Sequence, residues 1–140
     1  MILFTCSLFT VFGQVSEAEK AKQKLNQYLK SKSLDKLKEA KTIIDRAVDN
    51  APGSALLWYT KGLIYTEWIQ TDQATDKHFK ETVQSFKEAL ELDTKLNYRN
   101  KLVDGVNIFK RIASDSGAKG WSGADYKAAY DYYIHAVRAN

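Results

Sequence analysis

The sequence predicts an all-α protein whose helices pack in consecutive pairs. Ala, Leu, Lys and Glu dominate the middle of the chain and proline occurs only once, at Pro52, which is a helix-favouring composition. Apolar residues recur at intervals of three and four in successive segments, and no alternating run is long enough for a sheet. The 140 residues, 44% of them hydrophobic, suffice for one compact domain with a buried core.

The first thirteen residues, MILFTCSLFTVFG, carry no charge and resemble the apolar part of a secretory signal. They are too few to span a membrane, which takes about 20 apolar residues. Cleavage after Gly13 would place Val11 and Gly13 at the usual recognition positions and leave Gln14 first. We therefore expect a signal peptide over 1–13, a mature domain over 14–140, and export to the periplasm or cell envelope.

Two alternatives for this segment stay open. One is an N-terminal helix buried in the domain. The other is a lipid anchor on Cys6, because LFTC loosely resembles a lipoprotein signal, although Thr5 stands where such signals have a smaller residue. Cys6 is the only cysteine, so no disulfide can form within the chain.

The formal net charge of +4 is concentrated near the start of the mature domain. Between Gln14 and Lys41 eight lysines accompany four carboxylates, and the remaining charges cancel. Such a patch could attract nucleic acid, but acidic residues are interspersed and neither arginines nor an aromatic platform accompany the lysines. A solvated helix face is the better interpretation, and we expect no nucleic-acid partner.

Helical spacing and breakers place the elements in order. A first helix over residues 18–29 ends at the SKS of 31–33, and a second runs over 34–48. DNAPGS, residues 49–54, stops it, and Ser54 can cap a third helix that continues through Trp68 and Ile69. A polar insertion over 71–76 precedes a fourth helix near Phe79. We further expect a fifth helix from about Tyr98, a glycine-rich loop over 114–125 and a last helix over 129–137.

The segment LLWYTKGLIY matches a repeat signature. The tetratricopeptide motif is W-x2-L-G-x2-Y, followed by A-x3-F, a small residue and Pro, over about 34 residues. The third helix supplies Trp58, Gly62 and Tyr65, with Lys61 in place of the leucine. The second half of a preceding unit is supplied by Ala40, Ile44, Ala47 and Pro52. The same second-helix pattern recurs as Thr82, Phe86, Ala89 and as Ala129, Tyr133, Ala136.

The chain thus resembles tetratricopeptide-repeat (TPR) proteins over its mature length, and is similar to exported TPR proteins of the Bacteroidota type. The resemblance implies a right-handed superhelix of about three antiparallel helix pairs, a TPR-like α-solenoid. The first helix lacks W-x2-L-G-x2-Y, and Gly105 is one residue out of phase. In this register Gly62 and the small alanines let helices approach closely, while larger residues such as Trp58 fill the space between them.

The resemblance also implies a groove on the first-helix side of each pair that takes a peptide or helix. The residues that would line it are Leu56, Tyr59, Leu63, Thr66, Glu67, Leu102, Val106 and Phe109. The family's carboxylate clamp is missing, because Tyr59 and Leu63 occupy its places. The alternative is that the helix over 18–29, or sequence beyond Asn140, packs over this surface.

The sequence shows no motif for catalysis, a cofactor or a metal. His78 and His135 stand on different segments without acidic or thiol ligands at metal-binding spacing, and no phosphate loop or nucleophile elbow occurs. We expect a non-enzymatic protein-binding or assembly scaffold with a protein or peptide partner. An accessory component of an outer-membrane assembly or glycan-uptake system is the alternative, with membrane association through a larger complex. The last segment is apolar, whereas a terminal repeat normally has a polar outer face, so we also expect that the chain continues or forms a homodimer.

Export should remove residues 1–13, because the uncharged apolar start changes abruptly to a lysine-rich helix. Intact-mass measurement on protein recovered from an exporting host should show a chain that begins at Gln14. A chain in the envelope fraction that still carries Met1 would contradict this expectation.

Overall fold

The computed structural model describes residues 3–95, 104 and 107, and within these residues it is all helical. Four helices follow one another: α1 (Leu3–Ser31), α2 (Leu34–Asn50), α3 (Ala55–Trp68) and α4 (Asp76–Leu92). Residues 3–95 contain no strand. The all-α prediction is therefore confirmed for this part, whereas the predicted fifth helix, glycine-rich loop and last helix lie outside the described residues.

The predicted breaks coincide with helix ends. Lys32 takes a left-handed backbone conformation (φ 56°) directly after α1, and its N–H donates to the Tyr28 carbonyl (2.6 Å). The α2 helix ends before Pro52, and the Ser54 side chain accepts the Leu57 N–H at the start of α3. The α4 helix begins at Asp76, three residues before Phe79, because Thr75 serves as its N-cap.

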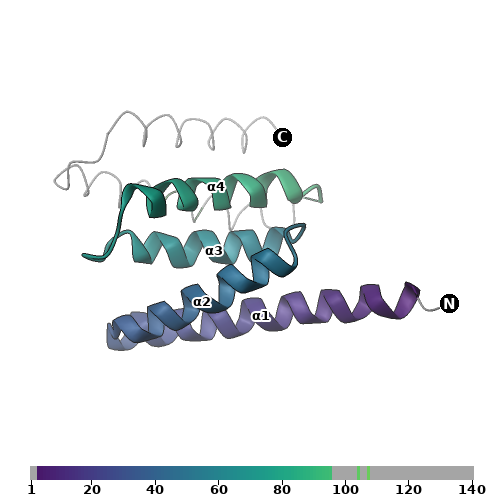
Figure 1. The fold of residues 1–140 in the computed structure, drawn as a ribbon, viewed down its shortest axis with the longest axis horizontal. Helices are drawn as coiled ribbons and strands as arrows, with labels where there is room; N and C mark the ends of the chain where they lie inside the picture. Colours follow the sequence, from purple (N-terminus) through teal and green to yellow (C-terminus); the bar gives the residue numbers. More distant parts are fainter. Residues whose placement is uncertain (1–2, 96–103, 105–106, 108–140) are drawn as a thin grey trace.

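The long α1 helix runs without interruption through Gly13. Its N-terminal end extends beyond the other three helices, as Figure 1 shows. Phe12 and Val15 are exposed there. None of the helices in residues 3–95 is long and apolar enough to cross a membrane.

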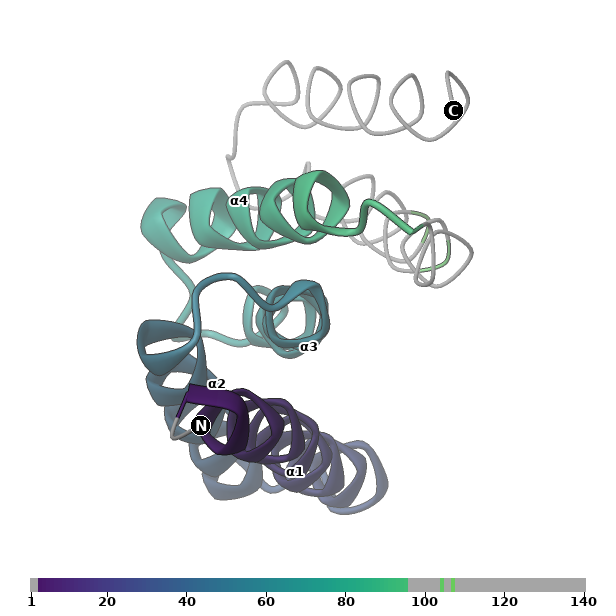
Figure 2. The same cartoon turned by 90° about the vertical axis from the view of Figure 1, so that its right-hand side faces the viewer.

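The helices stack so that α3 lies in the middle. It packs against α1 and α2 on one side and α4 on the other, and α1 and α2 also pack together (Figure 2). The α1–α2–α3 contact is built on small and aliphatic residues such as Ala21, Leu37 and Ile44. The contact with α4 is more aromatic and includes Tyr59, Phe79 and Phe86.

The contact between α3 and α4 leaves no room for a side chain at residue 62. A Cβ atom added to Gly62 would lie 2.5 Å from Cε1 of Phe86, whose ring is fully buried. The predicted close approach at Gly62 is confirmed. The other predicted contact residues within the described range behave accordingly: Ala40, Ile44, Ala47, Tyr65 and Ala89 are buried, and Trp58 is half-buried against both clusters.

Gly62→Leu should lower the free energy of unfolding by roughly 1–3 kcal/mol, because overpacking against Phe86 outweighs leucine's better helix propensity. Urea unfolding of the full chain provides the measurement. The matched control is Gly53→Ala in the turn before α3, where an added Cβ meets nothing within 4 Å, so stability should stay equal or rise. A Gly62→Leu variant as stable as wild type would contradict the packing.

Candidate functional site

The predicted groove residues on α3 are more covered than expected. Tyr59 and Thr66 are buried, with exposed fractions of 7% and 2%, and the Thr66 hydroxyl donates to the Gly62 carbonyl within its own helix. Leu56, Leu63 and Glu67 are half-buried. Of the five predicted groove residues on α3, these three keep accessible surface. The other predicted groove residues, Leu102, Val106 and Phe109, lie outside the described residues.

Part of this face is covered by α1. This agrees with the alternative that the helix over 18–29 packs over the predicted groove. Leu56 and Leu63 pack against the cluster to which α1 contributes Ala18, Ala21 and Leu25. Further along, Tyr28 of α1 lies close enough to Glu67 that its pKa is raised, first by burial and then by the carboxylate charge. Among the described residues, the accessible part of this face is a strip of α3 beside α1.

A polar cluster that the sequence did not predict joins α2 to α3. Its centre is Asp45 on α2, and Lys41 on the same helix lies 2.8 Å from one carboxylate oxygen. From α3, Lys61 lies 3.1 Å from the other oxygen, and the Tyr65 hydroxyl donates to the carboxylate at 2.9 Å. Lys61 is the residue that replaces the leucine of the repeat motif, and its side chain is only 13% exposed.

Asp45 carries the single negative charge of this cluster, opposite the two lysines Lys41 and Lys61. Burial alone would raise the pKa of Asp45, but the hydrogen bond from Lys41 and the positive charges of Lys61 and Lys41 outweigh it and lower that pKa. Burial and then the Asp45 charge raise the pKa of Tyr65 far above its usual range. Asp45 thus stays ionised and Tyr65 stays protonated. A carboxylate that accepts three donors stabilises packing and is poorly placed to act as a general base.

Aromatic rings hold both lysines in position. The Nζ atom of Lys41 lies 5.0 Å from the ring centre of Tyr65 and 5.9 Å from that of Trp68. The Nζ atom of Lys61 lies 5.6 Å from the ring of Trp58 and 5.1 Å from that of Tyr65. Such cation–π contacts add attraction where the cations are partly desolvated. Trp58 is fixed further, because its Nε1 donates to the Pro52 carbonyl at 2.7 Å.

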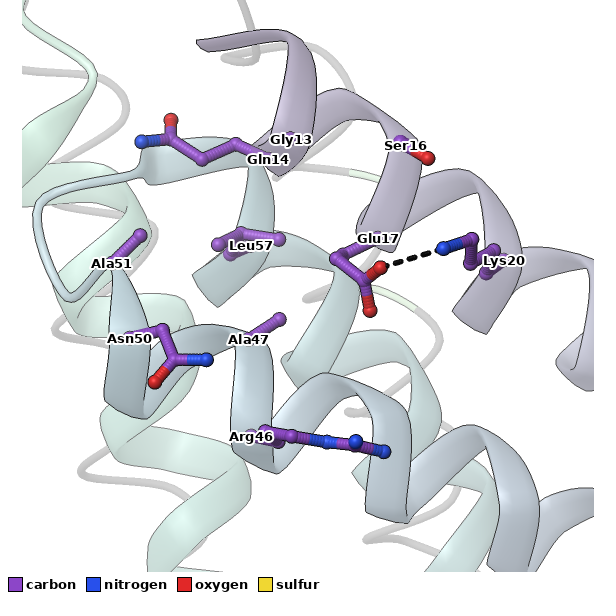
Figure 3. Close-up of a pocket in the computed structure, with 10 residues that line it drawn as sticks. All are labelled: Gly13, Gln14, Ser16, Glu17, Lys20, Arg46, Ala47, Asn50, Ala51 and Leu57. Atoms are coloured by element: carbon purple, nitrogen blue, oxygen red, sulfur yellow. Dashed lines mark hydrogen bonds and ion pairs between the residues drawn. The ribbon is translucent and has the colours of Figure 1, made fainter. Parts of the chain in front are cut away.

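A separate hollow of about 600 Å³ lies where α1, the end of α2 and the start of α3 meet (Figure 3). Ala47, Ala51 and Leu57 contribute its apolar lining. Its polar lining includes Arg46 and the Glu17–Lys20 ion pair, whose charged atoms are 2.8 Å apart. Gly13, the last residue of the predicted signal segment, is among the described residues that line it.

The described residues contain no group of three or more His, Cys, Asp or Glu side chains that could hold a metal ion. Of the two histidines, His78 lies at the start of α4 and His135 lies outside the described residues.

No family model, curated protein or solved structure matches the chain. The resemblance to TPR proteins therefore rests on the motif residues and on the contacts that they make.

Tyr65→Phe should lower the free energy of unfolding by about 1–2 kcal/mol, because it removes a hydrogen bond to a charged acceptor. In an Asp45→Ala background the same replacement should cost less, and the difference gives the coupling between the two residues. Tyr28→Phe on α1 is the control and should change stability by less than about 0.5 kcal/mol. Additive effects of Tyr65→Phe and Asp45→Ala would show that the hydroxyl and the carboxylate do not interact.

Proposed function

We propose that this chain is an exported helical-repeat scaffold that binds a protein or peptide partner. The observation that carries the proposal is the contact of Gly62 with Phe86. Gly62, the glycine of W-x2-K-G-x2-Y, lies against Phe86, the aromatic residue of the pattern that follows. The TPR motif implies this packing. We extend the arrangement to a right-handed superhelix of about three helix pairs.

The order of helix contacts supports a repeat architecture. Each helix packs against the next one along the chain, and α1 also packs against α3, the helix at the corresponding place of the following pair. Solenoids consist of such contacts between neighbouring units. The paired state of Asp45, Lys41 and Lys61 supports a structural role for this cluster.

The binding surface that we propose is the accessible strip of α3 formed by Leu56, Leu63 and Glu67. The two leucines suit the apolar face of a partner helix, and Glu67, which accepts from Gln70 at 3.1 Å, lies beside them. Tyr59 and Thr66 would support this strip from beneath, because both are buried. The lysines of α1 and α2 would influence mainly the rate of association, since exposed charges are screened beyond about 8 Å at physiological ionic strength.

Replacing Leu56 by Gln together with Glu67 by Lys should abolish partner capture and leave the helical content unchanged, because both side chains are only half-buried. Partners would be captured from the envelope fraction of the native host and identified by mass spectrometry. Binding of the identified partner would then be measured at two salt concentrations. The matched variant Lys30→Gln with Lys38→Gln changes two exposed lysines and should lower mainly the association rate. The proposed surface would be wrong if the Lys30 and Lys38 replacements abolished partner binding while the Leu56 and Glu67 replacements left it unchanged.

A further inference from the structure

The α4 helix begins with a histidine in an unusual capping role. Thr75 is the N-cap, and His78 occupies the third helical position, where capping boxes have Glu or Gln. The Thr75 backbone N–H donates to Nδ1 of His78 at 3.1 Å, and the Thr75 hydroxyl oxygen lies 2.9 Å from the same atom. Only an unprotonated Nδ1 can accept the backbone N–H, so this cap requires the neutral imidazole with its proton on Nε2.

Charged and aromatic groups face His78 from three helices. Lys41 and Asp45 lie on α2, and Lys77 and Glu81 lie on α4 itself. From α3 come the rings of Trp68 and Tyr65, with centres 5.7 Å and 6.2 Å from the imidazole centre. Burial and then the charge of Lys41 lower the pKa of His78, Lys77 acts in the same direction, and the two carboxylates oppose them.

Both carboxylates that face His78 already have cationic partners. Glu81 lies 3.8 Å from Lys77, and Asp45 on α2 is occupied by Lys41, Lys61 and Tyr65. The indole Nε1 of Trp68 is itself buried without an acceptor among the described residues. An imidazolium would bring a second N–H donor and a positive charge into this region, where Lys41 already lies above the Trp68 ring.

We propose that His78 makes the turn between α3 and α4 a pH-sensitive joint, in which protonation of Nδ1 breaks the cap and releases the first turn of α4. Neutral His78 accepts from Thr75 and closes the turn. Protonated His78 can only donate, so the Thr75 N–H loses its partner and the helix N-terminus gains an unfavourable positive charge. Phe79 follows His78 and is buried against the α3–α4 cluster, so opening exposes apolar surface of α3 and α4.

The direction of the pH effect follows from the two states of the histidine. His78 binds a proton more weakly in the folded protein than in the unfolded chain, where its pKa is about 6.5. Stabilisation by the cap is therefore complete above about pH 6.5 and decreases as the pH falls through this value towards the lower folded pKa. Below the folded pKa the loss is complete. The joint is thus closed at neutral pH and loosened in mild acid.

Hydrogen exchange on the full chain tests the joint. Protection factors of the amides of residues 79–82, which include the Phe79 N–H bonded to the Thr75 carbonyl, would be compared at pH 7.5 and pH 5. They should fall about fivefold to tenfold in acid, the amount expected for loss of a helix cap, while amides of residues 44–48 in α2 keep their protection. In His78→Gln, which can cap as glutamine does in capping boxes and does not titrate, the acid loss should disappear.

A second measurement keeps the proposal testable if His78→Gln folds poorly. The imidazole resonances of His78 in wild-type protein should titrate with a midpoint below 6.5, and Lys41→Gln should move that midpoint upward. A midpoint at or above 6.5 would overturn the proposal, as would unchanged protection of residues 79–82 in acid. Equal acid losses in wild type and a folded His78→Gln variant would also overturn it, because the loss would then come from another group.

Discussion

The close approach of α3 to α4 at Gly62 is the constraint on which the other contacts depend. Because residue 62 has no side chain, the Phe86 ring can lie directly against the α3 backbone. That position leaves the opposite side of α3 free to pack against α1 and α2. A larger residue at 62 would displace α4 and with it the aromatic contacts of Tyr59 and Phe79. One absent Cβ therefore permits the close packing of α4 on α3.

A second constraint is electrostatic and acts between α2 and α3. Lys61 is nearly buried, and a buried cation destabilises a fold unless it is paired. Asp45 supplies the partner, and Tyr65 and Lys41 use the remaining acceptor capacity of its carboxylate. The pairing fixes the relative position of the two helices more specifically than a leucine at residue 61 would, because ion pairs and hydrogen bonds depend on geometry. The departure from the motif at residue 61 is thus compensated within the chain.

The elements over residues 18–92 could be predicted from the sequence because their determinants are local. Pro52, Gly53 and Ser54 stop one helix and start the next, and apolar spacing identifies the buried faces. Gly62 could be placed at a contact because the repeat motif relates it to a residue more than twenty positions away. The sequence predicts a later start for α4 than the structure has, because a Thr75 N-cap followed by a histidine three residues on differs from the usual capping box with Glu or Gln.

The candidate sites could be predicted only in part, because they depend on which side chains from different helices meet. No local pattern shows that Lys61 pairs with Asp45 sixteen residues earlier, although a lysine at a leucine position was a signal that such a partner should exist. Burial of Tyr59 likewise depends on neighbours distant in sequence. The surroundings of His78 cannot be predicted for the same reason, because its neighbours Lys41, Tyr65 and Trp68 come from two other helices. The same side chains that stabilise the α2–α3 contact thus set the electrostatic environment of the α4 cap. Through Lys41, α2 contributes a positive charge that lowers the pKa of His78.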